Sequence, residues 1–142
     1  MPTAERTITI NRPVEEVFDF VADGRNAALW RSGVLDVDLV SGFGLGARYS
    51  QGVRGPAGRR IAADYEITEY EPNSKIGFRT TAGPVRPTGS FTFEGMGGGT
   101  ILTFALDAQL GGIQKLLLGR AVQSTVNAEM GALDRLKDLL ER

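Results

Sequence analysis

A long region of strand-type patterning followed by one long helical segment constrains this chain more than any other feature of its sequence. Between residues 35 and 106, apolar and polar residues alternate with a period of two in successive short runs, such as 47–54 and 61–68. Turn-forming residues separate the runs, and no helical period occurs between them. Because parallel strands would need crossover helices, this order predicts an antiparallel meander with one apolar and one solvated face.

The apolar face of such a sheet needs a cover, and residues 113–140 supply one. This segment contains no proline, its apolar residues recur at helical intervals, and charged residues occupy the remaining positions. The pattern predicts an amphipathic helix of about 28 residues, which at 1.5 Å per residue would extend roughly 42 Å. A helix of that length could lie across the whole sheet.

A short strand and two short helices are predicted before the meander. Residues 7–10 alternate as a strand does, and Pro13 with the two glutamates that follow is a helix-start signal. From Val14 onward, apolar residues recur at i, i+3, i+4 and i+7. Residues 26–31 favour a second short helix that carries Trp30, with a glycine stop after it.

Composition excludes several kinds of chemistry. The 142 residues include no cysteine and no histidine, which removes disulfides, thiolate metal sites and nucleophiles that depend on a histidine base. Basic residues number 16 and acidic residues 17, for a formal net charge of -1, so no general attraction to nucleic acid is expected. We expect no metal and no cofactor. The length fits a single domain over residues 1–142.

The chain carries no signal-peptide pattern at its start, and none of its apolar runs approaches the roughly 18 residues that a membrane span needs. We therefore expect a cytoplasmic protein without a membrane span.

The stretch SGFGLGARY, residues 41–49, fits a permissive version of the dinucleotide fingerprint G-x-G-x-x-G/A. That fingerprint requires a helix directly after it, because the pyrophosphate sits on the helix N-terminus. Residues 47–54 alternate with a period of two instead. The stretch is therefore interpreted as a hairpin connection whose glycines take positive φ.

Four parts of the sequence resemble those of a known superfamily. They are INRPVEEVFDFVADGRNAALW near the start, YEITEYEPNSKIGF in the middle, GSFTFEGMGGGTILTF in the late hairpin, and the last helix. With the order of elements, they resemble the START-like (SRPBCC) superfamily, in particular its polyketide cyclase/dehydrase-like branch, over nearly the whole chain.

This resemblance implies an α+β helix-grip (Bet v 1/START-like) fold. In that fold a curved antiparallel sheet of about seven strands wraps on a long C-terminal helix, and two short helices follow strand 1. It also implies a cavity between sheet and helix that usually holds a hydrophobic small molecule, with the second short helix at its rim.

Strand parity selects the side chains expected to face that cavity. Tyr49, Gln51 and Tyr65 carry hydroxyl and amide groups that need partners when buried, and Tyr49 and Tyr65 rank above the phenylalanines as orienting contacts. Ordinary core packing would account for the same positions. The full expected ligand-binding set is Trp30, Leu35, Val37, Tyr49, Gln51, Val53, Tyr65, Ile67, Phe78, Phe91, Phe93, Leu102, Phe104, Ile113, Leu116, Leu117 and Arg120.

Three functions stay open on this basis. The first is binding or carriage of a hydrophobic or aromatic small molecule, such as a lipid, a quinone or a polyketide-like compound. The second is a polyketide cyclase or dehydratase, for which Tyr49 and Tyr65 are weak catalytic candidates, since Asp64, Arg79 and Asp107 fall on the outward parity. The third is a protein-interaction module of the co-chaperone kind.

Two apolar segments have more than one interpretation. Phe43 and Leu45, in the glycine-rich stretch, would either cover the pocket mouth or pack against the last helix. Leu116 and Leu118 cannot both face one pocket. The apolar excess at residues 116–118 would therefore mark a gate or a dimer surface, which leaves monomer and homodimer both open.

Overall fold

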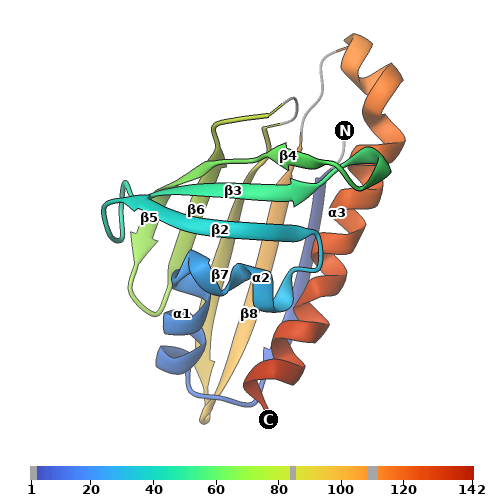
Figure 1. Cartoon of the computed structure of the whole chain (residues 1–142). Coiled ribbons are helices and arrows are strands. Elements are labelled where there is room, and N and C mark those ends of the chain that lie inside the picture. Colours follow the sequence, from blue (N-terminus) through green and yellow to red (C-terminus); the bar gives the residue numbers. More distant parts are fainter. Residues whose placement is uncertain (1–2, 84–85, 109–111) are drawn as a thin grey trace.

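The computed structural model describes residues 3–83, 86–108 and 112–142, without the side chains of residues 3, 56, 112–122 and 124–126. It has one antiparallel sheet, a long C-terminal helix and short helices after the first strand (Figure 1). The elements in chain order are β1 (Thr3–Ile10), α1 (Val14–Ala22), the single-turn helix η1 (Gly24–Asn26), α2 (Ala27–Trp30), β2 (Val34–Ser41), β3 (Arg48–Arg54), the single turn η2 (Pro56–Gly58), β4 (Arg60–Ala62), β5 (Tyr65–Glu71), β6 (Lys75–Thr80), β7 (Thr88–Met96), β8 (Gly99–Asp107) and α3 (Gly112–Leu140).

The sheet is the predicted meander, closed at one end by the first strand. Its order is β1-β8-β7-β6-β5-β3-β2, with β4 paired to β3, and every pairing is antiparallel. It curves so that β2 and β3 cross in front of β7 and β8 in Figure 1. The helix-grip fold is confirmed, with eight strands where about seven were expected. The short strand β4 accounts for the difference.

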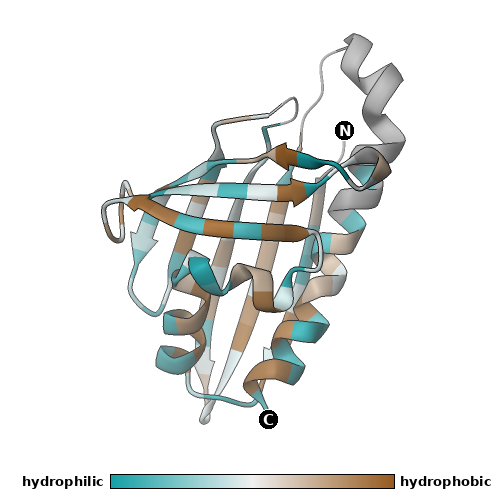
Figure 2. Ribbon diagram, in the orientation of Figure 1, coloured by the Kyte–Doolittle hydropathy of each residue, from teal (hydrophilic) through white to brown (hydrophobic). Residues whose placement is uncertain are grey.

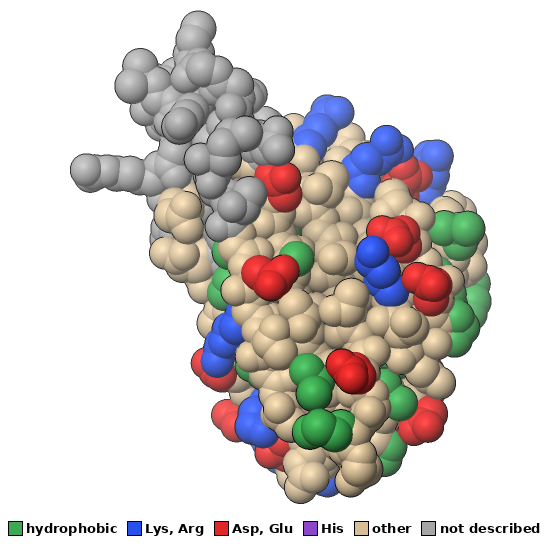
Figure 3. All heavy atoms as spheres, turned by 180° about the vertical axis from the view of Figure 1, so that it is seen from behind, with side chains coloured by type: hydrophobic (Ala, Val, Ile, Leu, Met, Phe, Trp, Pro, Cys, Tyr) green, Lys and Arg blue, Asp and Glu red, His purple; other side chains and the backbone are tan. Residues whose placement is uncertain are grey.

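Cross-strand rows explain how the two faces of the sheet differ. Ile76, Phe91 and Phe104 are register partners on adjacent strands of the inner face, and the rings of Phe91 and Phe104 stack with centroids 4.4 Å apart. Apolar and polar residues alternate along the strands (Figure 2). Scattered acidic and basic side chains occupy the outer face (Figure 3).

The core is completed by α1 and by the C-terminal half of α3. Val17 and Phe18 of α1 are buried, and the Phe18 ring meets that of Phe93 edge to face at 5.1 Å. Leu133 and Leu136 of α3 are fully buried. Burial of each such side chain is worth about 1.5–3 kcal/mol, so packing rather than helix propensity holds these helices in place.

Polar contacts fasten the same half of α3 to β1. Arg6 bonds both carboxylate oxygens of Asp134, at 2.5 and 3.1 Å. Lys137 Nζ donates to the carbonyl of Thr9 at 2.6 Å. The neighbouring Asn11 N–H donates to the Glu141 carboxylate at 2.7 Å. We call these three contacts the β1–α3 clamp.

Strand β2 departs from the expected parity. The register of β2 on β3 shifts between Val34 and Asp36, so Leu35 is the extra residue of a bulge. Leu35 is 40% exposed, whereas Val34 is buried. The expected inward position of Leu35 is therefore wrong, and the bulge gives the inner position to Val34.

The glycine-rich stretch is the connection from β2 to β3, as predicted. Gly42, Gly44 and Gly46 all have φ between 69° and 82°, where side chains other than glycine are strained. Phe43 and Leu45 are 85% and 68% exposed. The connection lies at the end of β2 and β3 away from α3 (Figure 1), so neither side chain packs on the last helix.

Candidate functional site

A cluster of polar side chains lies among the aromatic residues of the inner face. Tyr49 and Gln51 come from β3, and Tyr65 comes from β5. Arg31 follows the last residue of α2, and Glu129 lies on α3. The cluster therefore joins the sheet, the short helices and the long helix at one place.

The two tyrosines form its centre. Tyr49 and Tyr65 are register partners, and their rings stack with centroids 4.9 Å apart and an interplanar angle of 13°. The backbone N–H of Gly24 donates to Tyr49 Oη at 3.4 Å. A Cβ on Gly24 would lie 2.8 Å from Tyr49 Cε2 and would also collide with Tyr65 Oη. Glycine is thus required here by space, so that η1 can close over both hydroxyl ends.

The Tyr65 hydroxyl is a neutral donor. Burial raises the pKa of Tyr65 well above its ordinary value, and the positive charge of Arg31 opposes that rise only in part. Tyr65 Oη has no hydrogen-bond partner among the described residues. Tyr65 also keeps part of its surface accessible although its side chain points inward.

Arg31 and Glu129 form a bidentate ion pair. Arg31 Nε and Nη2 donate to the two carboxylate oxygens of Glu129 at 2.7 and 3.0 Å, and the side chains are 20% and 11% exposed. Burial by itself would lower the pKa of Arg31, but the charge and hydrogen bonds of Glu129 outweigh it, so the pKa lies above its usual value. Arg31 is therefore permanently charged.

Gln51 completes the polar cluster. Its Oε1 accepts from Arg31 Nη1 at 3.1 Å, and its Nε2 donates to the Ala63 carbonyl at 3.1 Å. Its backbone N–H donates to Asp64 Oδ1 at 3.1 Å. Both ends of this buried amide are satisfied, which fixes its orientation and, through it, that of Arg31.

Aromatic rings extend the wall from the tyrosines toward β8. The Tyr65 and Phe78 rings meet at 6.0 Å, and Phe78 lies 6.2 Å from Phe91 and 6.4 Å from Phe104. Phe78 lies on a central strand, yet it keeps part of its surface accessible. Trp30 packs edge to face on Phe91 at 6.1 Å and is 3% exposed. Trp30 thus belongs to the buried wall, not to a rim.

The remaining expected contacts divide into three groups. Ile67, Phe93 and Leu102 are buried in the core, whereas Val37 and Val53 are only partly buried. The side chains of Ile113, Leu116, Leu117 and Arg120 lie outside the described residues, as does that of Leu118. A ligand-binding role for any of these positions stays a prediction.

Sequence reasoning missed Arg31 and Glu129. The sequence assigns Glu129 to the charged positions of the last helix, although Leu133 and Leu136 follow it by four and seven residues. That spacing places Glu129 on the apolar face, and a carboxylate on such a face signals a buried partner. Arg31 gives no comparable signal, because it lies at the end of a very short helix.

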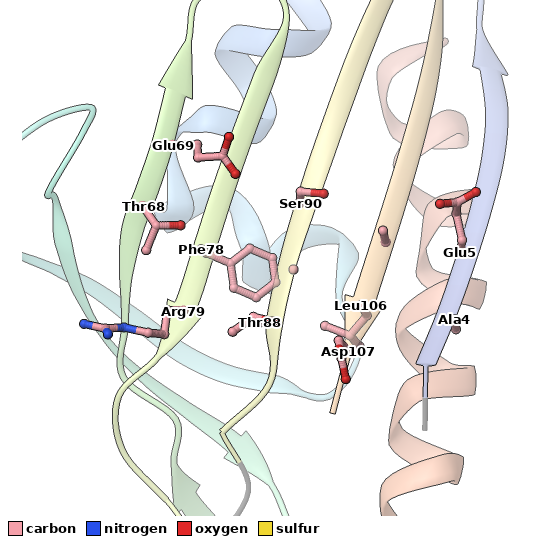
Figure 4. Close-up of a pocket in the computed structure, with 12 residues that line it drawn as sticks. Ala4, Glu5, Thr68, Glu69, Phe78, Arg79, Thr88, Ser90, Leu106 and Asp107 are labelled. Atoms are coloured by element: carbon pink, nitrogen blue, oxygen red, sulfur yellow. The ribbon is translucent and has the colours of Figure 1, made fainter. Parts of the chain in front are cut away.

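The outer face carries an open hollow of about 670 Å³ (Figure 4). Its lining includes apolar residues such as Phe78 and Leu106, together with the outward-facing Glu5, Glu69, Arg79, Thr88, Ser90 and Asp107. The outward-facing residues have the opposite parity to the tyrosine cluster, as the sequence predicts for Arg79 and Asp107, and Arg79 bonds to Glu66 there. The hollow is wide and open to solvent, so the buried aromatic cluster is the stronger candidate for a small-molecule site.

Comparison with known protein families shows which family this chain belongs to. Residues 1–141 match the family described as "Polyketide cyclase / dehydrase and lipid transport". The chain belongs to this family. Among curated proteins, none matches the sequence.

Several solved structures of other proteins share the fold of this chain. TTHA0849 from Thermus thermophilus has a TM-score of 0.79 at 21% identity, covering 96% of this chain and 95% of that one. The Zhui aromatase/cyclase from a Streptomyces species has a TM-score of 0.72 at 16% identity, with coverages of 99% and 95%. A START superfamily protein from Mycobacterium smegmatis has a TM-score of 0.67 at 16% identity, covering 94% of this chain and 98% of that one.

Membership of the polyketide cyclase/dehydrase and lipid transport family supports a cavity-type role, either binding or cyclisation, toward a hydrophobic small molecule. Within the part of the chain that the structure describes, no helix combines the length and the apolarity needed to cross a bilayer.

Proposed function

We propose that this protein binds or carries a hydrophobic, aromatic small molecule between the inner face of its sheet and α3. The observation that carries the proposal is the polar cluster of Tyr49, Tyr65 and Arg31 within an aromatic wall. A mostly apolar surface with a few placed polar groups is the usual design of a small-molecule site. Tyr65 points inward yet stays partly accessible, which supports the same assignment.

The wall favours a flat ligand. Tyr65 and Phe78 present rings at 68° to each other, so a planar molecule could stack on one ring while meeting the edge of the other. Both arrangements are favoured between aromatic groups. The neutral Tyr65 hydroxyl would then orient the ligand by donating a hydrogen bond to it.

A cyclase or dehydratase is the second candidate, favoured by a Tyr65 hydrogen-bond donor and the Arg31 cation in one cluster. Such a pair could stabilise a developing enolate by hydrogen bonding and positive charge. However, both oxygens of the Glu129 carboxylate accept hydrogen bonds from Arg31. The described cluster therefore lacks a poised general base. Binding without turnover is therefore the better-supported function.

Native mass spectrometry of the purified protein, before and after organic extraction, tests the proposal. We expect a bound mass that extraction removes, and reduced occupancy in Phe78→Trp, because the larger ring would fill the partly accessible space beside Tyr65. Thr92→Val on the outer face of β7 is the matched control and should keep full occupancy. Absence of any bound mass, together with failure to bind added aromatic compounds, would overturn the proposed function.

A further inference from the structure

We propose that Glu129 sets the ligand class of this site, restricting it to neutral conjugated carbonyl compounds and excluding carboxylic acids. The inference rests on the proposed function and goes beyond it by assigning selectivity to one residue. Glu129 makes both of its recorded bonds to Arg31, so its contribution is to occupy the cation that an acidic ligand would need.

The first step is the charge of the cluster. Arg31 and Glu129 together carry no net charge, and both are largely removed from solvent. A ligand carboxylate beside Arg31 would be a second anion on one guanidinium, which leaves a net negative charge in a poorly solvated place. Such a charge is costly when it is unpaired.

The other charged groups around the cluster do not offset that negative charge. The carboxylate of Asp64 accepts from the Gln51 backbone and contributes further negative charge. Asp23, at the start of η1, contributes a negative charge that acts on Tyr65. Its partner Arg25 is already bonded to both of the Asp23 carboxylate oxygens. An acidic ligand would therefore find no spare cation among the described residues here.

The second step is the supply of hydrogen-bond donors. A guanidinium has five N–H donors, and Arg31 uses three of them on Glu129 and Gln51. Among the described residues, the other two N–H groups have no hydrogen-bond partner. The Tyr65 ring stacks on that of Tyr49, two residues before the Gln51 amide that Arg31 bonds, so its neutral hydroxyl belongs to the same cluster. The cluster thus offers donors without net charge, which matches a neutral acceptor such as a carbonyl oxygen.

The third step is the shape of the wall. The rings of Tyr49, Tyr65, Phe78 and Phe91 follow one another across the sheet. A conjugated ring system could stack on one of these rings and meet the edge of the next, with its carbonyl toward Tyr65 and Arg31. A flat aromatic ketone or quinone satisfies both requirements.

Three naphthalene probes of matched shape test the inference in the full-length protein at pH 7. They are 2-acetylnaphthalene, 2-naphthoate and 2-ethylnaphthalene, with affinities measured by calorimetry or fluorescence. We expect the ketone to bind roughly tenfold more tightly than the carboxylate or the hydrocarbon. Equal binding of ketone and carboxylate overturns the selectivity but leaves the proposed function intact. Failure of all three probes to bind overturns both.

The variant Glu129→Gln supplies a gain-of-function test. Removal of the competing carboxylate leaves Arg31 with net positive charge, so the affinity for 2-naphthoate should rise about tenfold or more relative to the ketone. Asp134→Asn removes one negative charge from an exposed position of the same helix and should leave the preference for the ketone in place. An unchanged preference in Glu129→Gln overturns the inference.

A second variant keeps the test informative if Glu129→Gln folds poorly. In the double variant Arg31→Gln/Glu129→Gln, both charges are removed and two amides of similar size can bond to each other. The gain in 2-naphthoate affinity should then be absent, since the anion has no cation to meet. A gain that persists in the double variant overturns the role of the Arg31–Glu129 pair.

Discussion

Among single residues, Gly24 is under the tightest steric constraint in the candidate site. Substitution Gly24→Ala would push a methyl group into Tyr49 and Tyr65. We expect a loss of about 1–3 kcal/mol in the free energy of unfolding, typical of overpacking, with weaker ligand binding as the stacked rings separate. Chemical denaturation and a binding titration measure the two effects.

Gly33→Ala is the control for that substitution. A Cβ at Gly33 would meet no atom within 4 Å, so its effect on stability should stay within about 0.5 kcal/mol. Equal stability of the two variants would show that η1 can move away from the tyrosines without cost, and the steric argument would fail.

Of the secondary elements, α3 is held most firmly where it meets β1. Its described contacts there combine the buried Leu133 and Leu136 with the β1–α3 clamp. The hydrogen bond from Arg6 lowers the pKa of Asp134, and that from Lys137 lowers the pKa of Glu141. Two of the three clamp contacts, those of Asp134 and Glu141, therefore depend on ionised carboxylates.

This dependence predicts how stability changes in acid. A carboxyl whose pKa is lower in the folded than in the unfolded state stabilises the fold above its unfolded pKa, about 4. That contribution is lost as the pH falls through the folded value. The difference in melting temperature between wild type and Asp134→Asn should be present at pH 7, should shrink as the pH falls below about 4, and should vanish below the folded pKa of Asp134.

Asp138→Asn is the control for the clamp. Asp138 is an exposed carboxyl of the same helix whose described contacts include no ion pair. It should show little difference from wild type at either pH. A wild-type advantage over Asp134→Asn that persists unchanged at pH 3 would contradict the proposed role of the Arg6–Asp134 contact.

For the whole molecule, a ligand held between sheet and helix should stabilise all of the fold at once. A compound present at about 100 times its Kd adds roughly 2.7 kcal/mol to the free energy of unfolding if it binds only the folded state. For a domain of this size, that corresponds to a rise of several degrees in Tm. Thermal scans with 2-acetylnaphthalene measure it.

The same scan on Phe78→Trp separates cavity binding from surface binding. We expect a smaller rise in that variant, because the inner wall has less accessible space. A ligand that saturates the protein in calorimetry without raising Tm would show that it is not held by the folded interior.

Local periodicity determined most of the architecture. The alternation along β3, β6, β7 and β8 and the apolar face of α3 could be predicted because a strand or helix places side chains by sequence spacing alone. The exclusion of the dinucleotide fingerprint followed in the same way, from the strand after Gly46. Tyr49, Gln51 and Tyr65 were identified as inward polar residues for this reason.

Only the tertiary structure decided the partners and the exceptions. Arg31 and Glu129 are 98 positions apart in the chain, and spacing contains no information on such a contact. The bulge that turns Leu35 outward depends on the register of β2 against β3, and the burial of Trp30 depends on where α2 meets β7. These features arise from contacts between elements that are distant in the sequence. They can therefore be identified only from the folded structure.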